Sequence, residues 1–206
     1  VNGSLVADAV INNTATITAG NEITTGNNLA AAPLTVTVPR VAFSASAYSA
    51  GESGGAATLT VTLNVANPYA PVAVVVQSSN GSASAPADYG AISQTVTIPA
   101  GAQQTTFTVP IVGDAVDELD ETFGLALSAP VGAALGATGT ATVTITDDDT
   151  AGVTVAPTSG LTTTEAGGTV TFTVVLDSEP TAPVTVTLAS NDTTEGTVSP
   201  AQLVFT

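Results

Sequence analysis

The sequence predicts an all-β chain built from antiparallel β-sandwich modules of the immunoglobulin-like kind, arranged in tandem. Its composition is rich in Val, Thr, Ala and Gly, includes 12 Pro, and holds only one Lys or Arg. Apolar and polar residues alternate with a period of two, and turn-forming residues recur at short intervals. With 5 Phe, 3 Tyr and no Trp, the cores should be packed mainly by Val, Leu, Ile and Ala. These features together favour sandwiches over helical or mixed folds.

Residues 1–39 are predicted to be the C-terminal strands of an incomplete β-sandwich repeat. Short alternating segments are separated by Asn- and Gly-rich stretches, Asn12-Asn13 and Gly26-Asn27-Asn28. The segments are Leu5–Ile11, Thr14–Ala19 and Leu34–Val38. Three strands of this length bury too little apolar surface to stand alone, so the rest of that sandwich is expected to precede them.

Residues 40–149 hold a complete set of sandwich strands. The alternation is clear in runs such as Leu59, Val61 and Leu63. The predicted strands are Arg40–Ala47, Ala56–Val65, Pro71–Ser79, Ala91–Pro99, Gln103–Val112, Glu121–Ser128 and Thr138–Thr146.

Strand direction predicts that the acidic residues of this module lie at one end. If each strand runs antiparallel to the one before, the connections after the first, third, fifth and seventh strands share one end. Those after the first, fifth and seventh carry Glu52, the run Asp114–Glu121 and the run Asp147–Asp149. The connections at the opposite end contain no acid, and they are Asn67–Ala70, Pro99–Ala102 and Ala129–Ala137. This segregation indicates a site.

The charge balance indicates that a cation stabilises this acidic end. The chain has 17 acidic residues, one basic residue and no His. Two carboxylates about 5 Å apart cost on the order of 3 kcal/mol at an effective dielectric near 20, and the chain offers almost nothing to offset that. All-oxygen ligands suit Ca²⁺, whereas Mg²⁺ retains its waters and requires octahedral geometry. The alternative is an acidic rim that is simply solvated.

Several function classes are disfavoured by composition. A net charge of −16 argues against nucleic acid and anionic lipid as partners. The chain has no Cys, no Lys and no His, so thiolate sites, Schiff bases and the commonest general base are absent, and we expect no enzyme. A glycosidase-like carboxylate pair is disfavoured because no aromatic platform for sugar is evident. No apolar run approaches the length of a membrane span, and the absence of an initiator Met and of a signal peptide suggests part of a longer protein.

Residues 150–206 are predicted to be the first half of a second copy of the module. The stretch TTTEAGG stands where SAGESGG stood, which places Glu165 opposite Glu52, and Asn191-Asp192 falls near the position of Asn80. The copy covers about four strands and lacks the acidic fifth-strand loop and the terminal Asp run. Any cation site in it would be incomplete within this chain.

Residues 40–149 closely resemble a Calx-β domain, a module of sodium–calcium exchangers, integrin β4 and many bacterial surface proteins. The matching pieces are VAFSASAYSAGESGG, SSNGSASAPADYG, VTIPAGAQQTTFTVPIVGDAVDELDETFGLALSAP and TATVTITDDD. The resemblance implies a Ca²⁺ site whose acidic ligands map onto Glu52, Asp114, Glu118, Glu121, Asp147, Asp148 and Asp149. Asn80 and Gly113 stand where the exchanger domain has Asp, which implies fewer or weaker ions. Asp88-Tyr89 is interpreted as structural, with Asp88 capping a turn and Tyr89 packing at the sandwich edge.

The flanking segments carry weaker resemblances. The run NNTATITAG with GNNLAAAPLTVTV resembles the end of DUF11-type repeats of bacterial surface proteins, and residues 152–206 resemble Calx-β-like repeats of bacterial adhesins. These likenesses imply a secreted or cell-surface bacterial protein in which Ca²⁺ stiffens the joints between neighbouring modules of a stalk. Two alternatives stay open. One is an adhesin module that binds a protein or glycan through the loop with Tyr69. The other is a filament whose subunits complete each other's open sheets by strand addition.

Overall fold

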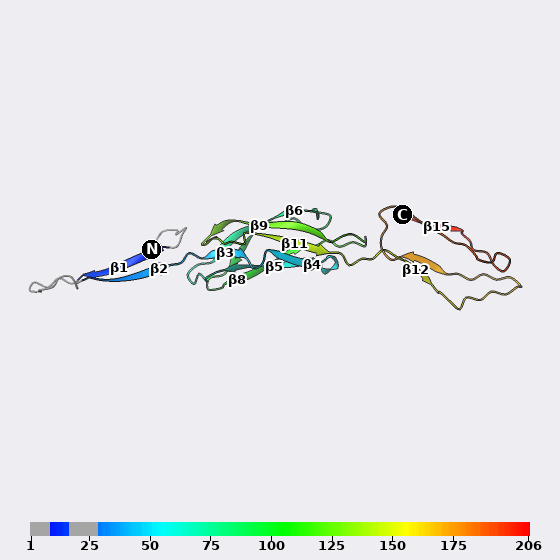
Figure 1. Cartoon of the computed structure of the whole chain (residues 1–206), viewed down its shortest axis with the longest axis horizontal. Helices are drawn as coiled ribbons and strands as arrows, with labels where there is room; N and C mark the ends of the chain where they lie inside the picture. The colour runs from blue at the N-terminus through cyan, green and yellow to red at the C-terminus, as the bar shows by residue number, and fades with distance from the viewer. Residues whose placement is uncertain (1–8, 17–28) are drawn as a thin grey trace, which may run out of the picture.

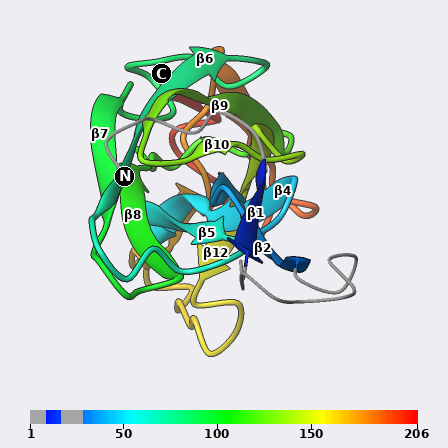
Figure 2. The ribbon, with the colours of Figure 1, turned by 90° about the vertical axis from the view of Figure 1, so that its left-hand side faces the viewer.

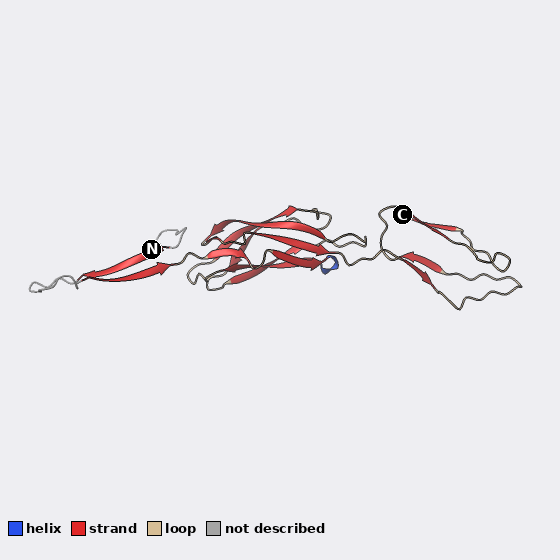
Figure 3. Cartoon of the chain, viewed as in Figure 1, coloured by secondary structure: helices blue, strands red, loops and turns tan. Residues whose placement is uncertain are grey.

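The computed structural model describes residues 9–16 and 29–206 and is built almost entirely of β-strands (Figure 1, Figure 3). A two-stranded hairpin comes first, a two-sheet module follows it, and two further hairpins lie beyond the module (Figure 1). This arrangement confirms the predicted fold class. Within the described residues, no helix is long and apolar enough to cross a membrane.

The first hairpin pairs β1 (Ala9–Thr16) antiparallel with β2 (Leu29–Val36) over eight residue pairs. The predicted break at Asn12-Asn13 is wrong, because both residues lie inside β1 and face Pro33 and Ala32 across the ladder. Asn is a poor strand former, but strand propensity is weak and continuous pairing with β2 overrides it. Parts of the predicted strands Leu5–Ile11 and Thr14–Ala19 fall outside the described residues.

The module between residues 40 and 146 is a sandwich of two sheets. One sheet has the order β10-β3-β5-β8 and the other has the order β4-β11-β9-β6-β7. Figure 2 looks along the long axis and shows β6 and β9 on the opposite side of the module from β5 and β8. The bounds are β3 (Arg40–Phe43), β4 (Ala47–Gly51), β5 (Ala56–Leu63), β6 (Val72–Asn80), β7 (Ser93–Ile98), β8 (Gln104–Pro110), β9 (Glu121–Val131), β10 (Ala134–Leu135) and β11 (Thr140–Thr146).

The first predicted strand is in fact two strands that belong to different sheets. β3 pairs antiparallel with β5, whereas β4 pairs parallel with β11. The small polar stretch between Phe43 and Ala47 lets the chain cross between the sheets. Tyr48 holds this crossing, since its hydroxyl lies 2.8 Å from Ser44 Oγ and donates to the Thr60 carbonyl at 3.2 Å. The short β10 is a second departure, because it lies within a stretch predicted to be a connection.

The module core is aliphatic, as the composition predicted. Val41, Leu59, Val61, Val109 and Val143 are completely buried. Every member of the buried core cluster lies between residues 41 and 145, so the module contains a closed core of its own.

One aromatic pair within this core differs from the prediction. Tyr89 is 1 % exposed and stacks on Phe123 with ring centroids 4.1 Å apart, so its predicted position at the sandwich edge is wrong. Burial of the ring is compatible with its polar hydroxyl because that hydroxyl donates to Asn80 Oδ1 at 2.7 Å.

The pairing confirms the predicted strand directions. β5 runs antiparallel to β3 and β8, β9 runs antiparallel to β6 and β11, and β4 runs parallel to β11. Consequently β4, β6, β8 and β11 all end at the same end of the sandwich. A single turn of 3₁₀ helix, η2 (Glu52–Gly54), follows β4 at this end. We call this end, from which the chain leaves toward the following hairpins, the exit end.

The last two hairpins repeat the register of the module. β12 (Val153–Ala156) pairs with β13 (Thr173–Leu176), and β14 (Val184–Thr187) pairs with β15 (Gln202–Phe205). Val153 faces Leu176 as Val41 faces Leu63 in the module, and Val184 faces Phe205 as Val72 faces Ile98. These corresponding pairs agree with the second copy expected in residues 150–206, which stays a prediction.

The two copies differ in how far equivalent side chains are buried. Val41 is completely buried, whereas its counterpart Val153 is 49 % exposed. Val155, Val175 and Val204 are also exposed. The described part of the second copy therefore has strand pairing without a closed core.

Equivalent substitutions in the two copies should differ in cost. We expect Val41→Ala to lower the free energy of unfolding of the module by about 2–3 kcal/mol, because it removes buried methyl groups and leaves a cavity. Val153→Ala, at the matching position, should cost below about 1 kcal/mol. Urea denaturation measures the free energy of unfolding of both variants. Far-UV circular dichroism is the signal to follow, because the chain has no Trp for fluorescence. Equal costs would contradict the open core of the second copy.

Candidate metal centre

The exit end of the module gathers carboxylates from four connections. Glu52 follows β4, Asp88 lies between β6 and β7, the run from Asp114 to Glu121 joins β8 to β9, and the run from Asp147 to Asp149 follows β11. The antiparallel order of the sandwich brings these segments together although they are far apart in the sequence. All seven sequence-predicted residues lie at this end.

Glu52 is the residue around which the site is arranged. Its side chain is only 8 % exposed, and it is the buried charged residue of the described chain. Its Oε1 accepts a hydrogen bond from the Asp114 backbone N–H at 3.0 Å. Burial raises the pKa of the Glu52 carboxyl; the Asp114 backbone hydrogen bond opposes the rise, and the charges of Asp114, Asp147 and Asp149 add to it. The carboxyl is thus held in place at an electrostatic cost.

Gly113 allows this arrangement. A Cβ atom placed on Gly113 would lie 3.0 Å from the Glu52 carbonyl oxygen and 3.4 Å from its Cγ. The loop after β8 therefore passes so close to Glu52 that a side chain at position 113 would require the backbone there to shift by a few tenths of an ångström. Gly113 has a steric role, and it is more than the loss of a ligand charge.

An outer group of three carboxylates has the spacing of a cation site. Glu52, Asp148 and Asp149 each place one oxygen within 4.8 Å of the others. Two oxygens on opposite sides of one Ca²⁺ are at most about 5 Å apart, so the spacing fits a single ion. Asp148 also accepts a hydrogen bond from the Ser53 hydroxyl. Burial, then the charges of Asp147, Asp148, Asp114 and Asp117, raise the pKa of Asp149.

An inner group surrounds a small cavity of about 10 Å³, which is the size of one water molecule or ion. Five carboxylates line it, namely Glu52, Asp88, Glu118, Glu121 and Asp147. Among the described residues, Asp147 Oδ1 is buried and has no hydrogen-bond partner. Burial raises the pKa of Glu121, and the charge of Asp88 and a hydrogen bond with it raise it further, followed by Glu118 and Glu52.

Asp114 differs from the other predicted ligands. Its Oδ1 accepts a hydrogen bond from the Val116 backbone N–H at 2.8 Å, so this carboxylate folds back on its own loop. It reaches Glu52 through its backbone N–H. In this structure Asp114 orders the loop after β8 and does not belong to the outer or the inner group.

Two residues at this end were not singled out as site residues from the sequence. Asp88 caps its turn as predicted, accepting from the Ser84 N–H at 2.7 Å, and it also lines the inner cavity. Asp120 accepts from the Asp147 backbone N–H at 3.2 Å and so positions that segment. Asp88 follows the third predicted strand, so the strand-direction argument would have placed it at this end if it had been applied to that connection.

Asn80 has a structural role in this loop. Its Oδ1 accepts hydrogen bonds from the Tyr89 hydroxyl at 2.7 Å and from the Ala85 N–H at 3.1 Å. The side chain therefore supports the loop between β6 and β7 and the buried tyrosine. The expectation that Asn80 in place of Asp weakens the ion site stays a prediction.

Comparison with known proteins agrees with this geometry. A search of curated proteins found no match. Among solved structures, the apo-form Calx CBD1 domain is 28 % identical with a TM-score of 0.51, and the match covers 54 % of this chain and 99 % of that chain. CBD12 from CALX1.2 is 29 % identical with a TM-score of 0.50, and 53 % of this chain matches 44 % of that chain. The calcium-binding domain CBD12 of CALX1.1 is 29 % identical with a TM-score of 0.50, and 46 % of that chain is matched.

This chain thus spans less than half of each of the two CBD12 structures, and nearly all of the single CBD1 domain. The family model for the Calx-beta domain matches residues 36–149, which include both sheets of the module and all the carboxylates described above. The chain belongs to the Calx-beta domain family.

Proposed function

We propose that the exit end of the module binds Ca²⁺ at two adjacent positions that share Glu52. The outer position uses Glu52, Asp148 and Asp149, and the inner position uses Glu118, Glu121 and Asp147 with Asp88. The observation that carries the proposal is the buried, unpartnered Asp147 Oδ1, in a residue that lines a cavity together with four other carboxylates. A buried acceptor of this kind is costly unless a donor or a cation satisfies it.

The proposed role of the ion is structural. Family membership agrees with the expectation that the chain is not an enzyme. Ca²⁺ that binds the folded acidic end and not the unfolded chain adds stability by mass action. It also offsets the burial, and the repulsion that adds to it, which raise the pKa values of Glu52, Glu121 and Asp149.

The joint to the second copy lies next to this proposed site. Asp149 is followed within four residues by Val153, the first residue of β12. On the other side, the Glu179 N–H donates to the Ala115 carbonyl at 2.6 Å, so the loop after β8 contacts the loop between β13 and β14. Both chain segments of the joint are therefore attached to segments that carry proposed ligands. Ca²⁺ that orders these segments would stiffen the joint.

The wider setting belongs to the same proposal. Residues 1–39, 40–149 and 150–206 would be successive modules of a secreted or cell-surface bacterial stalk, with neighbouring modules as the main partners. Two alternatives each have an observation in their favour. Tyr69, 94 % exposed, is available to an adhesion partner, and the exposed valines of β12, β13 and β15 are available to strands added from another subunit.

A Ca²⁺ titration of thermal unfolding tests the ion site. At a Ca²⁺ concentration about 100 times the dissociation constant, the gain is about 2.7 kcal/mol, which raises the midpoint by on the order of 10 °C. Glu118→Gln should raise the midpoint in chelator, because it relieves repulsion, and should reduce the Ca²⁺-dependent rise. Glu165→Gln, the same change at an exposed position of the second copy, should alter neither. An equal response to Mg²⁺, or no rise with Ca²⁺, would refute the proposal.

The role of Gly113 gives a second test. Gly113→Asp restores the acid found in the exchanger domain, but its Cβ would meet the Glu52 carbonyl. We expect it to lower the free energy of unfolding by about 1–3 kcal/mol without tightening Ca²⁺ binding. Gly139→Asp, where a Cβ meets nothing within 4 Å, adds the same charge and should be nearly neutral. Calorimetric titration showing tighter Ca²⁺ binding by Gly113→Asp would show that a ligand charge was the missing feature.

Small-angle X-ray scattering of the full chain tests the stiffened joint. Ca²⁺ should lengthen and narrow the distribution of interatomic distances. Glu179→Pro, which removes the N–H that donates to Ala115, should abolish the change, whereas Glu179→Ala keeps that N–H and should retain it. Identical profiles with and without Ca²⁺ would contradict stiffening. The forward scattering also gives the molecular mass, and a monomer at every concentration would count against the filament.

A further inference from the structure

The module and the second copy carry the same short motif at the same place. Asn67-Pro68-Tyr69-Ala70-Pro71 lies between β5 and β6, and Glu179-Pro180-Thr181-Ala182-Pro183 lies between β13 and β14. The two prolines and the alanine coincide when the strands are superposed by their pairing register. Both motifs therefore lie at the end of their sandwich opposite to the exit end.

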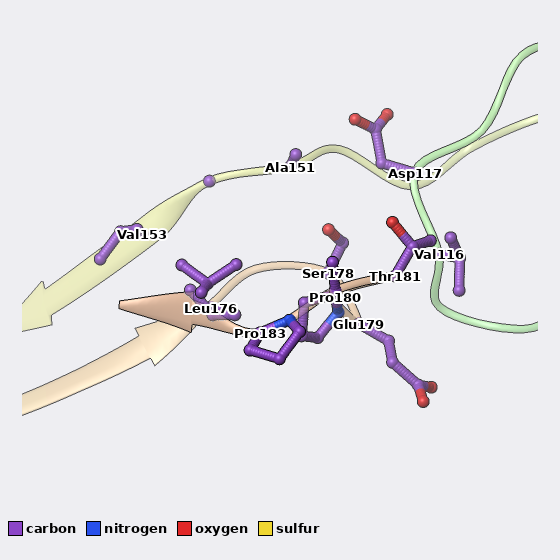
Figure 4. A pocket seen from close by; sticks show the side chains of 13 residues that line it. Val116, Asp117, Ala151, Val153, Leu176, Ser178, Glu179, Pro180, Thr181 and Pro183 are labelled. Atoms are coloured by element: carbon purple, nitrogen blue, oxygen red, sulfur yellow. The ribbon is translucent and has the colours of Figure 1, made fainter. Parts of the chain in front are cut away.

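In the second copy this motif contacts the preceding module. The Glu179 N–H donates to the Ala115 carbonyl at 2.6 Å. The whole motif, together with Val116 and Asp117 of the preceding loop, lines a hollow of about 490 Å³ (Figure 4). Figure 4 shows the Glu179 carboxylate pointing away from Asp117. The motif meets the loop through its backbone, and the charged side chain takes no part.

In the module the same motif is rigid and exposed. Asn67 Oδ1 accepts from the Tyr69 N–H at 3.2 Å, and the Asn67 carbonyl accepts from the Gly101 N–H at 2.8 Å. Tyr69 is 94 % exposed. Within the part of the chain that the structure describes, the Asn67 N–H, which matches the N–H of Glu179, has no acceptor.

We propose that Asn67–Pro71 is a docking surface for the exit-end loop of another Calx-beta module, of the type seen at Ala115–Asp117. The inference rests on the joint described under the proposed function, because that joint supplies the observed instance of the contact. The Asn67 N–H would donate to a loop carbonyl, and Tyr69, which replaces Thr181, would add apolar contact area. Asn67 in place of Glu179 also removes a negative charge beside an acidic loop, which favours the contact.

The partner is a separate module, because this chain's own loop is already engaged. The Ala115 carbonyl accepts from Glu179 of the same chain, so in a second full-length molecule the exit-end loop is already occupied. The module on its own does offer one. It is a suitable probe, since its core closes between residues 41 and 145 and the matching Calx CBD1 domain has been solved as a single domain.

Cysteine cross-linking tests this contact in a chain that has no native Cys. The full chain carrying Asn67→Cys is mixed, in Ca²⁺ and mild oxidant, with residues 36–149 carrying Ala115→Cys. Residues joined by such a backbone hydrogen bond lie within disulfide range. We expect the disulfide-linked heterodimer to form on the order of tenfold faster than with the control Thr97→Cys, an exposed position on β7. Adding Tyr69→Ala should slow it several-fold.

A second variant separates failure of this inference from failure of the joint. The full chain carrying both Ala115→Cys and Glu179→Cys should form an intramolecular disulfide. If that disulfide forms while Asn67→Cys reacts no faster than Thr97→Cys, the docking inference is overturned and the joint stands. If the intramolecular disulfide also fails, the joint itself is wrong, and the inference that rests on it falls too.

Discussion

Repulsion among carboxylates at one end of the sandwich is the constraint on which the rest of this structure depends. Burial, then the charges of Asp114, Asp147 and Asp149, raise the pKa of Glu52, and burial, then the charge of Asp88, raise the pKa of Glu121. With a single Arg in the chain and no Lys or His, protein groups cannot neutralise this end. The fold tolerates it because an aliphatic core closed between two sheets supplies the stability elsewhere. The proposed ion would turn the least favourable region of the module into a stabilised one.

The position of the acidic residues at one end of the module followed from the sequence, because the direction of each strand can be counted along the chain. Alternation predicted the strands, antiparallel order predicted the ends, and the acids then fell at one end. The count survived an error in detail, since β3 and β4 are separate strands that still run in the same direction. When a chain crosses between sheets without changing direction, the alternation of apolar and polar residues does not reveal the crossing, so β3 and β4 could not be separated from the sequence.

The individual roles of the residues at the acidic end could not be predicted from the sequence. Asp114 and Asp88 are both acids in exit-end connections, yet Asp114 bonds its own loop and Asp88 lines the inner cavity. Asn80 and Gly113 both looked like lost ligands. Asn80 instead holds the buried Tyr89, and Gly113 makes room for Glu52. These roles depend on where each side chain points and on how closely two backbone segments approach. The spacing of residues along the chain reveals neither of these.

The same segments serve the site and the joint, which explains why the two should be coupled. Two residues separate Asp114, whose carboxylate folds the loop, from Asp117, which borders the hollow shared with the second copy. Asp149 leads into β12 over a similar distance. No long linker separates the acidic end from the joint, so ordering of the acidic loops is transmitted directly to the joint. At the other end of the module, Asn67–Pro71 has the geometry of a contact already made once in this chain. A module with an acidic loop at one end and a matching backbone surface at the other is suited to repetition in line. On this view, occupancy of each ion site would set the stiffness of the joint that follows it.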